Sequence, residues 1–362
     1  MVNPSETGES WSNKLPLTRV VSSDLPDKIT EETSNTLYLD LDSVDTTTLD
    51  KAYEYCRQII KHGSKGFYFS TLFLPLEQRR AMWAIYNFCR YTDDMVDRAQ
   101  VNTRAELDAH LSAWETELRH SFEGKVYTNR FQMLAWQHTA HTFKIPLTPP
   151  LELIKGMRMD LTKSRYANYE ALRLYCYRVA STVGLMAAEV IGYSDPGALD
   201  YATELGIGMQ LTNILRDIGE DAKIGRIYLP QDEMANFGYT EEELLGGVIN
   251  ERFIKLMQFQ IARSRGCYKR ALPGIEFLHK DSRLAITVAA EQYSRILDAI
   301  ERNQYDVFNQ RAYVTLTGKL KCVAQVWTRR QFQSRPIPLS HTEIQSQGKF
   351  APILFTYDNE GF

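Results

Sequence analysis

The sequence predicts an all-α protein built around one helical domain, and three observations support this. From Thr47 onward, apolar residues recur at the three- and four-residue spacing of helices almost throughout. Signals that start and stop helices follow one another along the chain, and strand-like alternation between hairpin turns is missing. There is no internal repeat of fixed period, so we expect a single helical bundle over residues 46–330.

Both ends of the chain lack the helical period. Residues 1–45 are rich in Ser, Thr, Asp and Glu, and we interpret them as a disordered polar tail. Residues 331–362 lose the helical period and contain several prolines, which predicts an irregular C-terminal tail.

Local signals place the helices in chain order. Gly63 ends the first helix, and Ser64 and Lys65 form a loop before the next element. The later signals are a capping box at Thr103 and Glu106, an end at Gly124, a start at Asp195 and Pro196, an end at Gly225, a start at Thr240, and a last helix from Asp281 or Ser282 to Asn303.

Composition limits the classes of function. The chain has 362 residues, of which 44% are hydrophobic and 24% charged, and its net charge of -3 predicts no nucleic-acid partner. Its five cysteines are far apart, which argues against a zinc site or a disulfide framework. The most apolar helix is closed by Arg178 and Glu189, which predicts no membrane span. With no signal peptide or Arg-rich transit peptide, we expect a cytoplasmic protein, with peripheral membrane contact as an option.

The first candidate site lies in the predicted helix AMWAIYNFCRYTDDMVD, residues 81–97. An apolar line through Tyr86 continues into Asp93 and Asp97, and four residues are about one turn, so both carboxylates share a face towards the core. A solvated acidic turn is the alternative, but the apolar line and the helix dipole disfavour it. Buried like charges need a cation. Arg90 is either a salt-bridge partner or a phosphate ligand.

The second candidate site is the predicted helix GIGMQLTNILRDIGED, residues 206–221. Gln210, Asn213, Asp217 and Asp221 follow one another at steps of three, four and four, so they share one face. Oxygen ligands in such a row suit Mg²⁺, which binds few carboxylates and keeps several waters. A salt-bridged polar stripe is the alternative for this motif alone, but two inward acidic faces in one bundle indicate metal ions that bridge a diphosphate.

Further residues surround these motifs. The helix YCYRVASTVGLMAAEVI is dense in small residues, and a glycine at Gly184 indicates either tight helix packing or an apolar slot for a ligand chain. Ser64 and Lys65 are either a surface loop or a phosphate site. Tyr305 is a capping aromatic or an active-site hydroxyl. Candidates that follow the second motif and could close over it are Arg226 and Tyr228. The serine-hydrolase and dinucleotide-binding fingerprints are missing.

These residues together resemble a known family. Ser64-Lys65 with Phe67, and the runs WAIYNFCRYTDDMVD, YCYRVASTVG and QLTNILRDIGEDAKIGRIYLP, are similar to the squalene and phytoene synthases over residues 50–325. GMRMDL at residues 156–161 makes the resemblance closest to the phytoene synthases and more distant to dehydrosqualene synthase.

The resemblance implies a single-domain isoprenoid-synthase bundle around a central cavity, with Mg²⁺, or Mn²⁺ in its place, as cofactor. The implied metal ligands are Asp93, Asp97, Asn213, Asp217 and Asp221. The four aspartates and Tyr305 are the implied catalytic residues. The implied substrate contacts are Ser64, Lys65, Tyr86, Arg90, Tyr175, Val179, Gly184, Gln210, Asn213, Arg216, Arg226 and Tyr228. Two departures from the family pattern are Gly66, where Ser or Thr is usual, and Ser181, where Gly is usual.

The reaction that the resemblance implies is head-to-head condensation of two geranylgeranyl diphosphates, through a cyclopropyl diphosphate, to phytoene. This is the first committed step of carotenoid biosynthesis, so downstream carotenoid enzymes are expected partners. NADPH is not expected. The alternatives are a squalene or dehydrosqualene synthase that uses C15 substrates, a head-to-tail elongating synthase, and an inactive relative that serves as a scaffold. The intact aspartates argue against the last.

Overall fold

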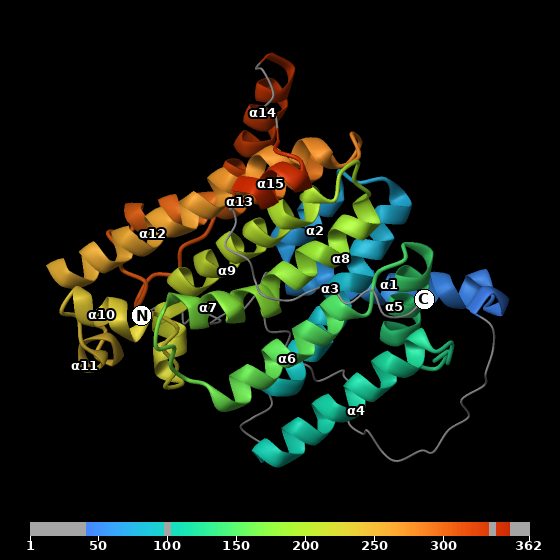
Figure 1. The fold of residues 1–362 in the computed structure, drawn as a ribbon, viewed down its shortest axis with the longest axis horizontal. Helices are drawn as coiled ribbons and strands as arrows, with labels where there is room; N and C mark the ends of the chain where they lie inside the picture. The colour runs from blue at the N-terminus through green and yellow to red at the C-terminus, as the bar shows by residue number, and fades with distance from the viewer. Residues whose placement is uncertain (1–40, 98–102, 333–337, 348–362) are drawn as a thin grey trace, which may run out of the picture.

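The computed structural model describes residues 41–97, 103–332 and 338–347, and these are helical almost throughout (Figure 1). The helices in chain order are η1 (Leu41–Ser43), α1 (Thr46–Gly63), α2 (Lys65–Thr71), α3 (Leu76–Asp97), α4 (Arg104–Phe122), α5 (Phe131–Thr142), α6 (Thr148–Thr162), α7 (Tyr169–Cys176), η3 (Tyr177–Ser181), α8 (Thr182–Ile191), α9 (Gly197–Lys223), α10 (Gln231–Asn236), α11 (Glu241–Leu245), α12 (Glu251–Ala271), η4 (Leu272–Phe277), α13 (Arg283–Arg302), α14 (Leu316–Phe332) and α15 (His341–Gln347).

The predicted all-α class is confirmed. Within the described ranges the sole β pairing is an isolated bridge between Tyr193 and Leu278. The local start signals also hold: capping boxes open α4 at Thr103 and α11 at Thr240. Gly124 and Gly225 follow helices with φ values of +89° and +72°, the left-handed backbone that glycine adopts without strain.

Helix α9 is the centre of the bundle. It packs against α8, η3, α12 and α13, and most of its 27 residues are buried. A helix surrounded on all sides can present polar residues only to an internal cavity or to buried partners. The second acidic motif lies in its C-terminal half, so this position forces the motif into the interior.

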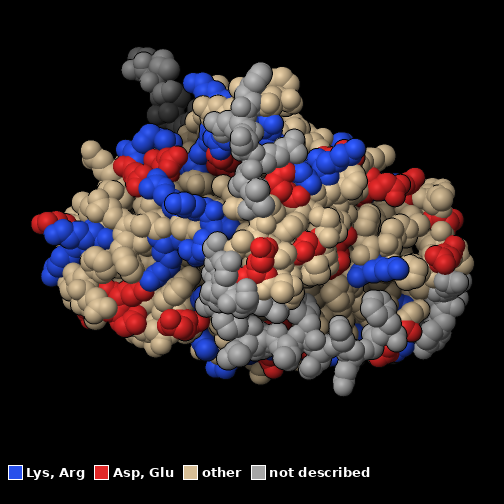
Figure 2. Space-filling view, turned by 45° about the horizontal axis from the view of Figure 1, so that its top comes forward, with Lys and Arg blue, Asp and Glu red and all other residues tan. Residues whose placement is uncertain are grey.

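Charges of both signs cover the face of the molecule shown in Figure 2, where blue and red side chains are interspersed with tan surface. Many of these charges form ion pairs between helices, such as Arg158 with Asp108 and Glu115, which joins α6 to α4. Exposed pairs of this kind contribute little to stability.

The C-terminal region differs from the irregular tail that the sequence predicts. Helix α14 continues to Phe332, and within the predicted tail 331–362 residues His341–Gln347 form α15. Ser340 caps α15 through Glu343, and Ile344 is buried against α9. The cap at Ser340 and the burial of Ile344 explain why this helix forms. Two residues are too few to give a helical period that could be recognised in the sequence. The expected polar tail 1–45 lies outside the described residues except for its last five positions.

The helix through Tyr169–Ile191 is longer than the sequence predicts. It runs for 23 residues without a break and, of the described residues, is the segment long and apolar enough to cross a membrane by length and composition alone. The most apolar part of it is 72% buried inside the bundle. Arg178 did not end this helix because its guanidinium reaches Glu152 of α6, with Nε 3.0 Å from Oε2. It is a core helix of the bundle.

Candidate active site

Helix α3 supplies one wall of the site. Asp93 and Arg90 are both buried, and the Arg90 guanidinium lies 2.6 Å from Asp94 Oδ1 and 3.7 Å from Asp93 Oδ2. Arg90 is therefore a salt-bridge partner of the motif in this structure. Asp97 is the last residue of α3, and its side chain lies outside the described part of the chain.

Helix α9 supplies the facing wall. Gln210, Asn213, Asp217 and Asp221 are all buried on one face of the helix, as their spacing predicts. The Asn213 amide nitrogen lies 3.3 Å from Gln210 Oε1, whereas Asn213 Oδ1 has no hydrogen-bond partner among the described residues. A buried carbonyl oxygen without a partner costs about 1–3 kcal/mol, so this atom is available for a ligand.

The two walls border the same cavity. Asp93 of α3 lines it together with Asn213, Asp217 and Asp221 of α9. The remaining lining residues come from α6, α7, η3, α9 and the loop after α9, and they are Met157, Asp160, Tyr175, Val179, Gln210, Ile214 and Tyr228. The two motifs, more than a hundred residues apart in the chain, therefore form one acidic site.

Arginines neutralise part of this acidity. Arg216 forks onto Asp217, with Nε 2.8 Å from Oδ1 and Nη2 2.6 Å from Oδ2, and Arg311 lies 2.9 Å from the same Oδ1. The sequence predicts metal ions as the positive charges that balance these acidic faces. In the structure, the guanidinium groups of Arg216, on the same helix, and Arg311, on a distant segment, already balance the charge of Asp217.

Asp160 is a site residue that the sequence analysis missed. Its carboxylate accepts hydrogen bonds from the hydroxyls of Tyr175, at 3.0 Å, and Tyr228, at 3.1 Å, and these hydroxyls lie 3.2 Å apart. Arg226 donates to the Asp160 carbonyl oxygen at 3.2 Å. The available signal was the line Leu153, Met157 and Asp160, in which an apolar helix face ends in an acid as it does in α3.

Burial sets the protonation of the tyrosine pair. It raises the pKa of Tyr175 and of Tyr228 well above the ordinary value of 10, and the nearby Asp160 carboxylate raises both further. Both hydroxyls are therefore neutral at physiological pH and act as donors to Asp160. The aromatic rings of Tyr166, Tyr175 and Tyr228 pack on one another and hold this arrangement.

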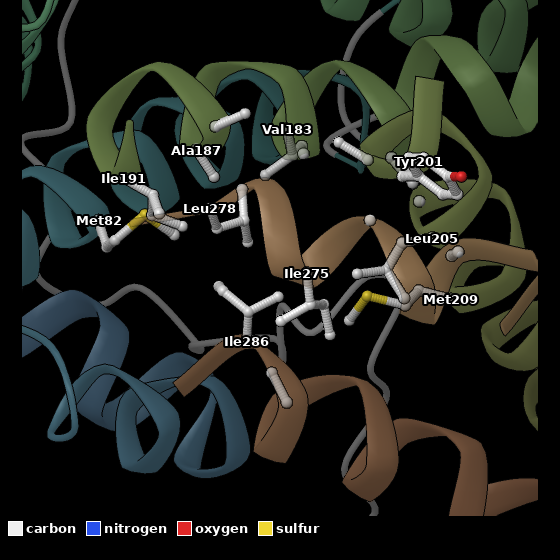
Figure 3. A pocket seen from close by; sticks show the side chains of 18 of the residues that line it. Met82, Val183, Ala187, Ile191, Tyr201, Leu205, Met209, Ile275, Leu278 and Ile286 are labelled. Atoms are coloured by element: carbon white, nitrogen blue, oxygen red, sulfur yellow. The ribbon is translucent and has the colours of Figure 1, made fainter. Parts of the chain in front are cut away.

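An apolar pocket, whose lining is shown in Figure 3, adjoins the acidic cavity. Gln210 and Asn213 line both, so the polar and apolar spaces meet at these two residues. The empty volume of the apolar pocket is about 1110 Å³, part of which is open to solvent. In Figure 3 side chains from α3, α8, α9, the η4 region and α13 point into this space, among them Met82, Val183, Ala187, Ile191, Tyr201, Leu205, Met209, Ile275, Leu278 and Ile286.

Small residues make this pocket. A Cβ added at Gly184 would lie 3.1 Å from the carbonyl oxygen of Ala202, so α8 and α9 cross closely there, and Gly184 also lines the pocket. Tight helix packing at this glycine is therefore observed, and its role in a slot for a ligand chain stays a prediction. Ser181, which departs from the family pattern, does not line the pocket, because its hydroxyl donates to the Thr203 carbonyl oxygen at 2.7 Å.

A single π turn, η3, lies in the part of the helix Tyr169–Ile191 where the side chains change from lining the acidic cavity to lining the apolar pocket. The amide of Thr182 bonds to the carbonyl of Tyr177, five residues earlier, which adds one residue to the turn. Tyr175 and Val179 face the acidic cavity, whereas Val183 and Ala187 face the apolar pocket.

The start of α2, at Ser64 and Lys65, lies beside a lysine of α14. Ser64 caps α2 by accepting from the Phe67 amide at 3.3 Å, and Phe67 lines the apolar pocket. Burial and the neighbouring Lys65 ammonium lower the pKa of Lys319, a residue of α14 that the sequence analysis missed. A Cβ at Gly66 would lie 3.7 Å from Lys319 Nζ. Two close ammonium groups beside a serine suit an anion.

Tyr305 lines neither of the two cavities, and its catalytic role stays a prediction. Its hydroxyl accepts from Gln258 of α12 at 3.1 Å. Left-handed backbone at Gln304 and Tyr305, with φ of +53° and +62°, turns the chain after α13 and carries this side chain outward. The tyrosine beside the second motif is instead Tyr293 of α13, whose buried hydroxyl bonds to Arg216.

Tyr86 lines the apolar pocket, and its hydroxyl has no hydrogen-bond partner among the described residues. The same hydroxyl lies where a Cβ at Gly63 would fall, 2.4 Å away, so the glycine that ends α1 leaves room for it. A buried hydroxyl at an apolar wall is available to a polar group of a ligand.

The acidic cavity fits a divalent cation by its donor set. Carboxylates and the unpartnered Asn213 oxygen are hard oxygen ligands, which Mg²⁺ prefers. Within residues 41–97, 103–332 and 338–347, however, no three His, Cys, Asp or Glu side chains stand close enough to hold one ion. The ligands are spread over two walls, so an ion here would need water and substrate oxygens to complete its shell.

Fold and site together define a helical enzyme for a substrate with an anionic end and a long apolar end. A family model described as squalene/phytoene synthase matches residues 60–318. The chain belongs to the squalene/phytoene synthase family, whose members are prenyltransferases.

Individual relatives agree with this membership. Phytoene synthase of Arthrospira platensis is 45% identical over 289 residues, which cover 76% of this chain and 92% of that protein. The 15-cis-phytoene synthase of Synechocystis sp. is 43% identical over 296 residues, covering 78% and 87%. The crystal structure of a dehydrosqualene synthase in complex with ligand superposes with a TM-score of 0.74 at 29% identity, covering 79% of this chain and 99% of that one.

Proposed function

We propose that this chain condenses two geranylgeranyl diphosphates head to head, through a cyclopropyl diphosphate, to phytoene. The observation that carries the proposal is the junction at Gln210 and Asn213, which line both an acidic cavity with residues of the two aspartate motifs and an apolar pocket. A prenyl diphosphate has the same two-part chemistry. The identities of 45% and 43% to phytoene synthases, against 29% to a dehydrosqualene synthase, favour the C20 substrate over the C15 one.

We propose Mg²⁺, with Mn²⁺ as an alternative, as the cofactor of the acidic cavity. Asp93, Asn213, Asp217 and Asp221 would hold it, with Asp97 as a further ligand whose side chain the structure does not describe. Bound Mg²⁺ would neutralise the diphosphate and the negative charge that grows on it as it leaves.

The residues of the chain supply positioning and a dry environment. Arg90, Arg216 and Arg311 offer guanidinium groups next to the aspartates, and they can exchange a carboxylate for a diphosphate oxygen when substrate arrives. Apolar side chains along α8 and α9 exclude water from the allylic cation that forms when the first C–O bond breaks. The double bond of the second substrate attacks that cation, and loss of a proton closes the cyclopropane.

The second half of the reaction needs the same groups again. The remaining diphosphate leaves, the carbon skeleton rearranges, and a second proton is lost, so two substrates give phytoene, two diphosphates and two protons. Tyr175 and Tyr228 donate to Asp160 at the edge of the acidic cavity, and each neutral hydroxyl can exchange that hydrogen bond for one to an oxygen of a released diphosphate without titrating.

Product analysis tests the function. The purified chain is incubated with C15 or C20 prenyl diphosphate and Mg²⁺, with and without NADPH, and the hydrocarbons are identified by mass spectrometry. We expect a C40 product from the C20 substrate that does not depend on NADPH. Consumption of the C15 substrate alone would identify a squalene or dehydrosqualene synthase instead. A scaffold protein would consume neither.

Cytoplasmic location, peripheral membrane contact and association with downstream carotenoid enzymes stay predictions. What supports membrane contact is the chemistry of the proposed reaction, since a C40 hydrocarbon does not dissolve in water.

A further inference from the structure

Helix α14 exposes a stripe of large apolar side chains. Leu316, Leu320 and Trp327 are 67%, 54% and 55% exposed, and their spacings of four and seven residues place them on one helix face. Another face fixes the helix to the bundle, where Cys322 and Val326 are buried against α13. The stripe thus serves no packing role within the described bundle.

The position of α14 extends this surface. Figure 1 shows α14 projecting from the bundle at its C-terminal end. Phe73 of the turn between α2 and α3 packs against the buried face of α14. The same turn exposes Leu72 and Leu76, by 42% and 61%, and Tyr313 just before α14 is 68% exposed.

The charge of this segment is of one sign. Between Asp306 and Glu343 the sequence contains no acidic residue. The cations in that interval are Arg311, Lys319, Lys321, Arg329, Arg330 and Arg335. Arg329 and Arg330 reach acids on neighbouring elements, Glu291 and Glu276.

Lys321 is exposed beside the stripe, and no ion pair of it is found within the described residues. On the other side of the stripe is Lys319, whose Nζ lies 3.7 Å from where a Cβ at Gly66 would fall and whose pKa is lowered by burial and by Lys65. The surface around Leu320 is therefore both apolar and cationic.

We propose that this surface, the stripe of Leu316, Leu320 and Trp327 with its flanking lysines, docks the chain onto a membrane that contains anionic lipids. An apolar stripe with cations at its sides is the pattern of a helix that lies in the lipid interface. A second copy of the chain is a poorer occupant, because two such helices would bring like charges together. Helix α14 is 17 residues long with four cations, so it lies on a bilayer and does not cross it.

The proposal rests in part on the proposed function. The substrate chains and the C40 product partition into lipid, and Lys319 of this same helix faces the loop of Ser64 and Lys65 beside the apolar pocket. Docking through α14 would place that loop next to the lipid headgroups, where a prenyl diphosphate presents its anionic end.

Vesicle flotation of the full chain tests the surface. The vesicles are phosphatidylcholine alone or mixed with phosphatidylglycerol. We expect binding to the mixed vesicles, and at least about tenfold weaker binding of the double variant Leu320→Ser/Trp327→Ser because two apolar groups no longer enter the lipid. The matched control is Val248→Ser/Ile249→Ser, a second exposed apolar pair of 41% and 38% exposure, which should bind as the wild type does.

Tryptophan fluorescence tests which part of the chain contacts the lipid. Trp83, Trp114 and Trp136 are buried, whereas Trp327 is exposed. Brominated lipid should quench the fluorescence of the wild type, and Trp327→Phe should lose that quenching while Trp11→Phe keeps it.

Four outcomes would overturn the surface: no binding by the wild type, equal binding by both double variants, quenching that survives Trp327→Phe, or a wild-type dimer that becomes monomeric in Leu320→Ser/Trp327→Ser. None of them depends on turnover. Failure of the C40 assay with vesicle binding intact would overturn the proposed function and leave the surface standing.

Discussion

At the scale of single residues, the site contains carboxylates that already form ion pairs with arginines, and it also contains one amide oxygen that has no hydrogen-bond partner among the described residues. Asp217 is held by Arg216 and Arg311, whereas Asn213 Oδ1 has no partner among the described residues. Removing these two groups should therefore have different costs in stability. Deleting a paired buried carboxylate leaves its arginine partners without a counter-charge, whereas deleting an unpaired oxygen leaves no donor unsatisfied.

Asn213→Ala should separate binding from stability. We expect the melting temperature to fall only slightly, because the removed side chain carries a buried unsatisfied oxygen and a single long hydrogen bond, from Nδ2 to Gln210 Oε1. The Mg²⁺ concentration for half-maximal activity should rise, and turnover should fall by about 10- to 100-fold. Titration of activity with Mg²⁺, together with thermal unfolding, measures both. A large loss of stability would show that the Asn213 side chain is structural.

Asp160 should act through its tyrosines as a positioning residue. Asp160→Asn replaces a carboxylate that accepts two hydroxyl hydrogen bonds with an amide that can accept only on one side. We expect kcat to fall by about tenfold or more with little change in KM. The triple variant Asp160→Asn/Tyr175→Phe/Tyr228→Phe should lose no more than Tyr175→Phe/Tyr228→Phe, because Asp160 acts through these two hydroxyls. Fully additive losses would contradict this role.

At the scale of elements, close helix crossings shape the pocket. Gly206 of α9 meets the π turn η3, where an added Cβ would lie 2.5 Å from Ser181 Cα and 2.9 Å from the Ala180 carbonyl carbon. Backbone atoms cannot yield as a flexible side chain does, so this contact fixes the distance between the two helices that line both cavities.

Gly206→Ala should therefore lower the free energy of unfolding by about 1–3 kcal/mol, through overpacking. Gly266→Ala in α12 is the matched control, because its nearest contact is the end of the Arg270 side chain at 3.2 Å. That control should raise stability by up to about 1 kcal/mol through helix propensity. Chemical unfolding of both variants measures the difference, and a Gly206→Ala protein as stable as the control would show that the crossing can relax.

A histidine joins α1 to α5 and makes their contact sensitive to acid. His138 Nδ1 lies 2.8 Å from the Tyr53 hydroxyl, and burial, with Arg80 second, lowers the pKa of His138 below 6.5. Because the folded-state pKa is depressed, its contribution is fully present above pH 6.5 and is lost as pH falls. We expect His138→Gln to flatten the fall of stability below pH 6.5, measured by urea unfolding across pH. An unchanged slope would show that other groups set it.

At the scale of the whole molecule, the bundle surrounds the acidic cavity with carboxylates and guanidinium groups that partly balance one another. Because guanidinium groups already offset Asp93, Asp94 and Asp217, the bundle is not destabilised by an acidic interior that awaits metal. The balance changes only when an anion arrives to take up those guanidinium groups and frees the carboxylates for cations.

Metal and diphosphate should therefore stabilise the protein jointly. We expect Mg²⁺ alone to raise the melting temperature little, and Mg²⁺ with inorganic pyrophosphate to raise it by several degrees, since a ligand at 100 times its Kd contributes about 2.7 kcal/mol. EDTA should abolish the joint effect. Differential scanning calorimetry measures it, and an equal shift from pyrophosphate without Mg²⁺ would contradict a metal-bridged site.

The sequence alone determined the helical class, the starts and ends of most helices and the inward direction of both acidic motifs, because a 3.6-residue period and a capping residue act over a few positions. The tertiary structure decided what meets across space. It brought Asp160, Tyr293 and Arg311 to the acidic site, placed Lys319 beside the start of α2, and put the Tyr305 hydroxyl against Gln258 of α12. Such meetings depend on helix crossings and on a left-handed turn after α13, which local spacing does not encode.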